Sequence, residues 1–317
     1  MYTIKSVDRK ILQPYFRKSN LRGLFYLAIN WLVILFFMVL PGIWFTPFSV
    51  LISVLVLGGR QLGLAILMHD CAHRSLFASK KLNDFLGKWA CGAPVMVSLS
   101  GYRSYHLKHH SFTGSDEDPD RSNYDQYPVS KKSMIRKFLR DVSGLTGIKL
   151  TLIMFRMNLG LLDYDLSYQT GVKKSSAKKI GVNFLKNLLP TIVIHLILFL
   201  ALYAAGIAYC WFLWPLAWLT SYMVFSRIRN AAEHAVVPDL FSQDPVDNTR
   251  TVLAGWLSRI TVAPNFVNYH LEHHLLPGVP GFQLPKIHKL LAGSEEYQNA
   301  DVSRSYWHVL KNLVSSR

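Results

Sequence analysis

The strongest constraint on the fold is a set of four apolar runs, at residues 24–45, 48–68, 184–209 and 211–226. Backbone N–H and C=O groups find no water inside a bilayer, so a segment that crosses it has to be a helix or a strand of a closed barrel. Apolar runs of about 20 residues fit helices. Half of the chain is hydrophobic and 17% is charged, which favours a membrane protein over a soluble one. We predict an all-α integral membrane fold with four transmembrane helices.

The distribution of basic residues predicts the orientation of these helices. Lysine and arginine are frequent in residues 1–23 and 103–182, and Arg227 and Arg229 follow the fourth run, whereas the loops after the first and third runs carry no charge. Positive charge accumulates on the cytoplasmic side of membrane proteins. We therefore expect both termini in the cytoplasm. The whole chain, 1–317, would form one membrane-embedded domain whose cytoplasmic helical cap comprises residues 69–182 and 227–317.

Four stretches fit this plan less simply. Gly58-Gly59-Arg60-Gln61 interrupts the second run, and we expect the span to end near Arg60, the alternative being an arginine that faces protein inside the membrane. Residues 85–100 are apolar but too short to span, which predicts a buried or re-entrant segment. Residues 131–141 and 147–163 mix apolar and basic residues. They fit either helices on the membrane surface or amphipathic helices packed on the cap.

The placement of the basic residues and of the cysteines argues against nucleic-acid binding, a disulfide framework and a thiolate metal site. The formal net charge is +16, from 35 basic and 19 acidic residues, but the basic residues flank apolar runs and form no nucleic-acid module, so we predict no nucleic-acid partner. The three cysteines, Cys71, Cys91 and Cys210, include no Cys-x-x-Cys pair. Their number and spacing argue against a disulfide framework and against a thiolate metal site.

Nine of the 12 histidines fall in four short patterns. Residues spaced i, i+3, i+4 share one face of a helix, so each pattern presents several imidazoles together. A single histidine is usually a surface or core residue, but repetition of the same spacing favours a shared metal site. His195, alone in an apolar run, is instead expected to form a hydrogen bond between helices. The clustered histidines are His69 and His73; His106, His109 and His110; His234, four residues after Asn230; and His270, His273 and His274.

The number of histidines points to two metal ions. Imidazole binds zinc, copper, iron and nickel, but eight or nine imidazoles are too many for one closed four-ligand site. None of the five glutamates precedes a histidine by three residues, as a di-iron carboxylate bundle would require, and His-Glu-x-x-His is absent. We therefore expect a dinuclear, all-imidazole centre, with iron as the metal. A ligating imidazole needs an acceptor for its second N–H, and nearby acidic residues could supply it: Asp70, Glu272, Asp118 and Asp120.

With these motifs the sequence resembles the membrane fatty acid desaturase and hydroxylase superfamily. His-Asp-Cys-Ala-His at 69–73, His-Leu-Lys-His-His at 106–110 and His-Leu-Glu-His-His at 270–274 are similar to its three histidine boxes. Residues 111–120 look like the stretch that follows the second box, and residues 275–288 like the segment after the third. The resemblance covers about residues 25–290.

The resemblance implies a non-haem di-iron centre at the cytoplasmic ends of four membrane helices. It implies no catalytic residue beyond the metal ligands. Dioxygen would be the co-substrate, and two electrons per turnover would come from a separate donor, a ferredoxin or a b-type cytochrome, which a basic cytoplasmic face would attract. Asn230 would contact one iron, directly or through water. The implied iron ligands are His69, His73, His106, His109, His110, His234, His270, His273 and His274.

The function that we predict is oxygen-dependent desaturation of a fatty-acyl lipid chain. A lipid hydroxylase, or a carotenoid hydroxylase or ketolase, has similar boxes and stays an alternative. A histidine-rich metal transporter is a remote one, since it would need polar ligands in mid-membrane and only His195 lies there. A bacterial inner membrane fits this compact chain, with the endoplasmic reticulum left open. Acyl chain length, double-bond position and the carrier of the substrate do not follow from the sequence.

Overall fold

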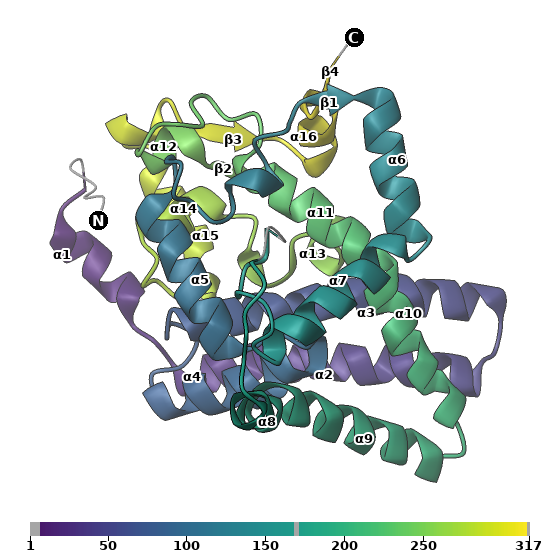
Figure 1. Cartoon of the computed structure of the whole chain (residues 1–317). Coiled ribbons are helices and arrows are strands. Elements are labelled where there is room, and N and C mark those ends of the chain that lie inside the picture. The colour runs from purple at the N-terminus through teal and green to yellow at the C-terminus, as the bar shows by residue number, and fades with distance from the viewer. Residues whose placement is uncertain (1–6, 168–170, 316–317) are drawn as a thin grey trace.

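The computed structural model of the protein describes residues 7–167 and 171–315, and most of these are helical (Figure 1). The α-helices that precede the third apolar run are α1 (Arg9–Leu12), α2 (Asn20–Ile43), α3 (Pro47–Ala72), α4 (Lys80–Leu86), α5 (Leu99–Phe112), α6 (Lys131–Val142) and α7 (Leu145–Asn158). Those that follow are α8 (Ala177–Asn183), α9 (Leu189–Ala204), α10 (Leu213–Leu219), α11 (Ser221–His234), α12 (Pro245–Asn248), α13 (Trp256–Ile260), α14 (His270–Leu275), α15 (Leu284–Leu291) and α16 (Tyr306–Asn312).

Three of the described helices are long and apolar enough to cross a membrane. They are α2, α3 and the continuous helix Ala177–Ala204, in which a π-helical stretch, Phe184–Leu188, joins α8 to α9. A reciprocal capping box starts α3: the Thr46 hydroxyl accepts from the Ser49 N–H, and the Ser49 hydroxyl accepts from the Thr46 N–H, both at 3.1 Å. The cap and Pro47 explain why the chain turns back so sharply after α2.

The fourth predicted span, 211–226, is not one continuous helix. It lies in a 3₁₀ turn, in α10 and in the first part of α11, and the helix breaks at Thr220, where φ is −119° and ψ is −87°. Neither α10 nor α11 is long enough to span by itself, so a fourth spanning helix stays a prediction.

Helix α3 is the centre of the assembly, since α2, α5, α10 and α11 all pack against it. In its most apolar window 67% of the residues are buried, against 28% in α2 and 22% in Ala177–Ala204. In Figure 1, α2, α3 and α9 lie in the lower half of the view, and α14, α15 and the short strands lie on the other side of α3. The lower helices therefore carry the surfaces that suit contact with lipid, and α3 connects them to the upper half.

Arg60 faces protein, which is the alternative that the sequence favoured less. Helix α3 runs unbroken through Gly58 and Gly59, and Arg60 Nη2 donates to the carbonyl oxygens of Arg259 at 2.8 Å and Ile260 at 2.9 Å. Those carbonyls belong to the last residues of α13. Carbonyl groups in the last turn of a helix have no partner within the helix, so they are free to accept a hydrogen bond from Arg60. The absence of a side chain at Gly59 lets this backbone approach the helix closely.

The segment between α4 and α5 is buried, as predicted for residues 85–100. It forms a π-helical turn, Gly87–Gly92, and a 3₁₀ turn, Ala93–Val95, that pack against α3 and α9. His195 of α9 reaches this segment, and its Nε2–H donates to the Pro94 carbonyl at 3.0 Å. The prediction that His195 forms a hydrogen bond between elements is confirmed.

Four short strands depart from the all-α prediction. They form two parallel pairs, β1 (Val129–Ser130) with β4 (Val314–Ser315), and β2 (Arg250–Val252) with β3 (Asp301–Ser303). With two or three residues each, they give almost no period-two pattern to detect in a sequence. They attach the C-terminal segment to the chain just before α6 and α13.

The close approach at Gly59 predicts a loss of stability in Gly59→Ala. A Cβ there would lie 2.1 Å from the Ile260 carbonyl oxygen, so backbone has to move, and we expect a cost of about 1–3 kcal/mol. Gly181→Ala in α8, where nothing lies within 4 Å of the added Cβ, should instead stabilise its helix by about 1 kcal/mol. Thermal unfolding of the detergent-purified variants measures both. Equal midpoints for the two variants would contradict the close packing of α13 on α3.

Candidate metal centre

Four helices bring the nine clustered histidines together. Histidines lie in the last turn and C-cap of α3, on α5, at the C-terminus of α11 and on α14. The structure divides them into two groups, within each of which one ligand atom per residue lies within 4.8 Å of the others. The first group is His69, His73, His106, His110 and His273. The second group is His109, His234, His270 and His274.

Each three-histidine motif contributes to both groups. On α5, His106 and His110 belong to the first group and His109 to the second; on α14, His273 belongs to the first and His270 to the second. Histidines at i and i+4 lie above one another on a helix, and the residue at i+3 lies to one side. One turn of helix thus supplies histidines to both groups.

The ring nitrogens of the first group converge at the spacing of ligands on one ion. His110 Nε2 lies 3.0 Å from His106 Nε2 and 2.9 Å from His273 Nε2, and His273 Nε2 lies 3.0 Å from His69 Nε2. A neutral imidazole has a single N–H, so these nitrogens cannot all be satisfied by one another. Two nitrogens bound at right angles to one ion, each at about 2.1 Å, lie about 3.0 Å apart.

The second group shows the same arrangement. His270 Nε2 and His234 Nε2 are 2.9 Å apart. In the two groups together, two buried ring nitrogens, His73 Nε2 and His274 Nε2, have no hydrogen-bond partner among the described residues. Leaving a buried polar atom unpaired costs about 1–3 kcal/mol. The converging nitrogens and these two unpaired atoms fit two metal ions.

Hydrogen bonds from the Nδ1 side orient three of these rings. His69 Nδ1–H donates to Asp70 Oδ1 at 3.0 Å, and His109 Nδ1–H donates to Asp118 Oδ1 at 2.7 Å. His234 Nδ1–H donates to a backbone carbonyl, that of Asn248, at 3.0 Å. Such bonds fix the tautomer and leave the Nε2 lone pair free to ligate.

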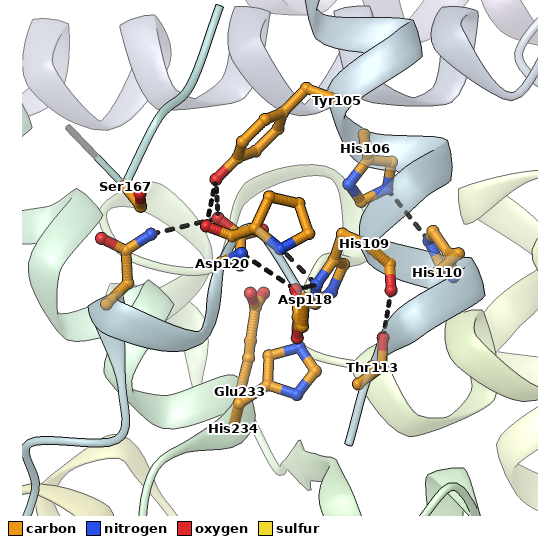
Figure 2. A network of polar contacts seen from close by, with 12 residues as sticks. Tyr105, His106, His109, His110, Thr113, Asp118, Asp120, Ser167, Glu233 and His234 are labelled. Atoms are coloured by element: carbon orange, nitrogen blue, oxygen red, sulfur yellow. Dashed lines mark hydrogen bonds and ion pairs between the residues drawn. The ribbon is translucent and has the colours of Figure 1, made fainter. Parts of the chain in front are cut away.

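Asp118 is itself held in place by the loop after α5 (Figure 2). It accepts from the hydroxyl of Tyr124 and from the backbone N–H of Asp120 at 2.9 Å. The carboxylate of Asp120 accepts from the Tyr105 hydroxyl at 2.5 Å and lies 3.7 Å from His109 Nδ1. The two predicted aspartates of this loop thus lie beside the second group, with Asp118 in direct contact with a histidine.

Burial keeps most of these imidazoles neutral. Together with the nearby His109, it lowers the pKa of His73 to about 4 and the pKa of His234 to about 3. His109 differs, because its hydrogen bond to Asp118 and the charges of Asp118 and Asp120 outweigh burial and raise its pKa. A metal ligand has to be neutral imidazole, so at pH 7 the shifts at His73 and His234 favour ligation.

Two predicted residues lie in other surroundings. Glu272 is fully buried on α14, but its contacts are to Thr251 at 2.5 Å, His288 Nδ1 at 2.5 Å and the Tyr297 hydroxyl, not to a histidine of either group. It connects α14 to β2 and α15. Asn230 accepts from Arg229 Nη1 at 2.9 Å and lines a cavity of about 70 Å³ beside the second group. The cavity has room for water between Asn230 and the histidines.

Three further groups support the second histidine group and were not predicted from the sequence. Glu233 Oε1 lies 3.4 Å from His270 Nδ1 and pairs with Arg229 Nε at 2.5 Å. The ring of Tyr124 stacks on His234 with centroids 5.0 Å apart, and the Asn248 carbonyl accepts from His234. Glu233 precedes His234 in the chain and could have been proposed from that position. Tyr124 and a backbone carbonyl carry no signal in the sequence.

The hydrogen bond between Asp118 and His109 predicts that Asp118→Asn weakens one metal site selectively. The amide is a poorer acceptor than the carboxylate, and loss of such a partner typically lowers metal affinity about 10–100-fold. We expect one of two bound ions to be lost first when iron is limited by a competing chelator, with Asp125→Asn, an exposed carboxylate of the same loop, behaving like the wild type. Metal content by mass spectrometry measures this. Equal weakening of both ions in Asp118→Asn would contradict the separate roles of the two groups.

Comparisons with known proteins give a family match and several relatives. The family model for fatty acid desaturases matches residues 45–306. The chain is 25% identical over 287 residues to dihydrorhizobitoxine desaturase of Bradyrhizobium elkanii, which covers 86% of this chain and 76% of that protein. It is 23% identical over 257 residues to sn-1 oleoyl-lipid 12-desaturase of Picosynechococcus sp., covering 76% of this chain and 68% of the relative.

A third relative matches over a shorter region. The chain is 31% identical over 131 residues to sn-1 acyl-lipid omega-3 desaturase (ferredoxin) of Synechocystis sp., covering 41% of this chain and 35% of that protein. The family match spans all three histidine motifs and His234.

Proposed function

Because the chain belongs to the fatty acid desaturase family, we propose that it introduces a double bond into the acyl chain of a lipid, using dioxygen and electrons from a separate donor. The nine clustered histidines hold two iron ions, one in each group. The observation that carries the proposal is the convergence of buried ring nitrogens 2.9–3.0 Å apart in both groups. Iron held there would activate dioxygen, which is the oxidant: two hydrogens of the acyl chain, two electrons from the donor and two protons would reduce it to water.

The protein contributes orientation and exclusion of water. Asp70, Asp118 and the Asn248 carbonyl each hold one imidazole N–H, so the corresponding Nε2 atoms point inward. His69, His106, His109, His234, His270, His273 and His274 are all buried. Exclusion of water protects a reactive site from side reactions. Asn230 would contact one iron, directly or through water in the cavity of about 70 Å³ that it lines.

The membrane placement suits a lipid substrate. Helix α3 carries His69 and His73 at its C-terminal end, directly after a segment apolar enough to span a bilayer. An acyl chain can therefore reach the histidine groups from the lipid phase. In this proposal the chain 1–317 is one unit with four spans, and both termini and the site face the cytoplasm of a bacterial cell.

Electrons come from a separate acidic carrier. The chain carries a formal charge of +16, and such a surface attracts an acidic partner at long range. One relative is named for its use of ferredoxin, which supports a ferredoxin over a b-type cytochrome as the donor.

Expression in a host without an oxygen-dependent desaturase of its own tests the proposal. We expect a new unsaturated fatty acid that forms only in air and disappears in His273→Ala, because His273 contacts both His69 and His110 of the first group. His308→Ala, an exposed histidine on α16, should retain the product. Gas chromatography with mass spectrometry measures the acyl chains. A new hydroxy acid in place of the unsaturated acid would contradict desaturation and assign the same site to a hydroxylase.

A further inference from the structure

A cleft of about 320 Å³ lies between α6, α7, α11 and the loop before β1. Four basic side chains from three helices line it: Lys137, Arg140, Lys149 and Arg227. Amide and hydroxyl side chains line the rest of its wall, together with Tyr127, Leu150 and Met223. Neither the histidine groups nor their hydrogen-bond partners use these four charges.

The positive charge in the cleft is poorly compensated. Arg227 forms a two-point ion pair with the buried Asp141, at 2.5 and 2.9 Å. Lys137 Nζ donates to the neutral Gln126 side chain at 2.6 Å. Within the described part of the chain, no carboxylate lies within ion-pair distance of Lys137, Arg140 or Lys149. Among the described residues, the half-buried Lys137 and the exposed Arg140 and Lys149 therefore lack a counter-ion.

Like charges lie close to one another around Lys137. Burial lowers its pKa, and the charges of Arg227 and Arg140 lower it further despite the opposing effect of Asp141. Ser122 and Thr146 also line the cleft, but their hydroxyl oxygens are buried, without a hydrogen-bond partner among the described residues. Cations gathered around one cavity match an anion with several oxygen atoms.

The cleft is adjacent to the second histidine group. Asn123 and Asn230 line both the cleft and the smaller cavity of about 70 Å³, whose wall includes His109, His234 and His270. A molecule bound in the cleft therefore lies next to the candidate metal centre. This position suits a part of the substrate better than a distant regulatory ligand.

The helices that carry the cations also carry exposed apolar side chains. On α6 these are Ile135, Leu139 and Val142, and on α7 they are Leu145, Ile148, Leu152 and Phe155. Apolar residues beside lysine and arginine on one helix are typical of a helix at the membrane surface. A headgroup in the cleft can thus remain joined to a chain that lies among lipids.

We propose that this cleft binds the phosphate-bearing headgroup of the acyl substrate, with Lys137, Arg140 and Lys149 supplying the charge. The inference rests on the proposed function and names the class of acyl carrier. Two carriers share this chemistry, an anionic phospholipid and an acyl-coenzyme A thioester. A neutral acyl ester lacks the phosphate and should bind weakly.

Binding to the iron-loaded protein in a neutral detergent tests the inference without turnover. The probes are oleoyl-lysophosphatidylglycerol, oleoyl-coenzyme A and monooleoylglycerol, which share one acyl chain. We expect at least one phosphate-bearing probe to bind about tenfold or more tightly than monooleoylglycerol, and Lys137→Gln/Lys149→Gln to remove most of that difference. Lys131→Gln/Lys132→Gln removes the same charge from exposed positions of α6 outside the cleft and should retain it.

Each result decides a separate point. Preference for lysophosphatidylglycerol assigns the carrier to a membrane phospholipid, and preference for oleoyl-coenzyme A assigns it to the thioester. Equal affinity for monooleoylglycerol, or equal weakening by the two double variants, would overturn the inference. Iron content and thermal unfolding of each variant show that it is folded and loaded. Desaturation in the expression host is measured separately, so a missing product with selective phosphate binding would indicate failure of the proposed function alone.

Discussion

The structure depends on the convergence of nine imidazoles from four helices at one place. To bind a metal ion, a ring nitrogen has to be buried, neutral and free of other hydrogen bonds. In the absence of the ion, a buried polar atom without a partner lowers the free energy of unfolding. The protein meets the first two by burial and by acceptors such as Asp70 and Asp118. The third leaves His73 Nε2 and His274 Nε2 unpaired. Metal binding would therefore add to the stability of the fold.

Helix α3 connects the histidine groups to the rest of the molecule. It begins at the Thr46 cap, packs against α2, α5, α10 and α11, and ends at the first two histidines. Arg60 in its middle donates to the carbonyls at the end of α13, so a hydrogen-bonded contact joins the membrane-crossing half to the histidine-bearing half. A displacement of α3 would therefore move His69 and His73 relative to α5 and α14.

The sequence was sufficient to predict which histidines come together, because i, i+3, i+4 spacing restricts them to one side of a helix. Helix geometry separates the residue at i+3 from the pair at i and i+4, but which histidines of α5 share a group with which histidines of α14 was not predictable, since it depends on how the two helices approach each other. The contacts of Glu272 were not predictable for the same reason. Its position next to His273 suggested a hydrogen bond to a metal-ligating histidine, but its side chain instead contacts Thr251 and His288. The helix break at Thr220 was not predictable either, because the apolar composition of residues 211–226 does not differ between one helix and two.

The position of bound iron tests the central claim most directly. Crystals of the iron-loaded protein, measured on both sides of the iron absorption edge, would locate each ion from its anomalous scattering. The account predicts two peaks per chain, one enclosed by the first group and one by the second. A single peak, or peaks outside the two histidine groups, would contradict a dinuclear centre built from these nine residues.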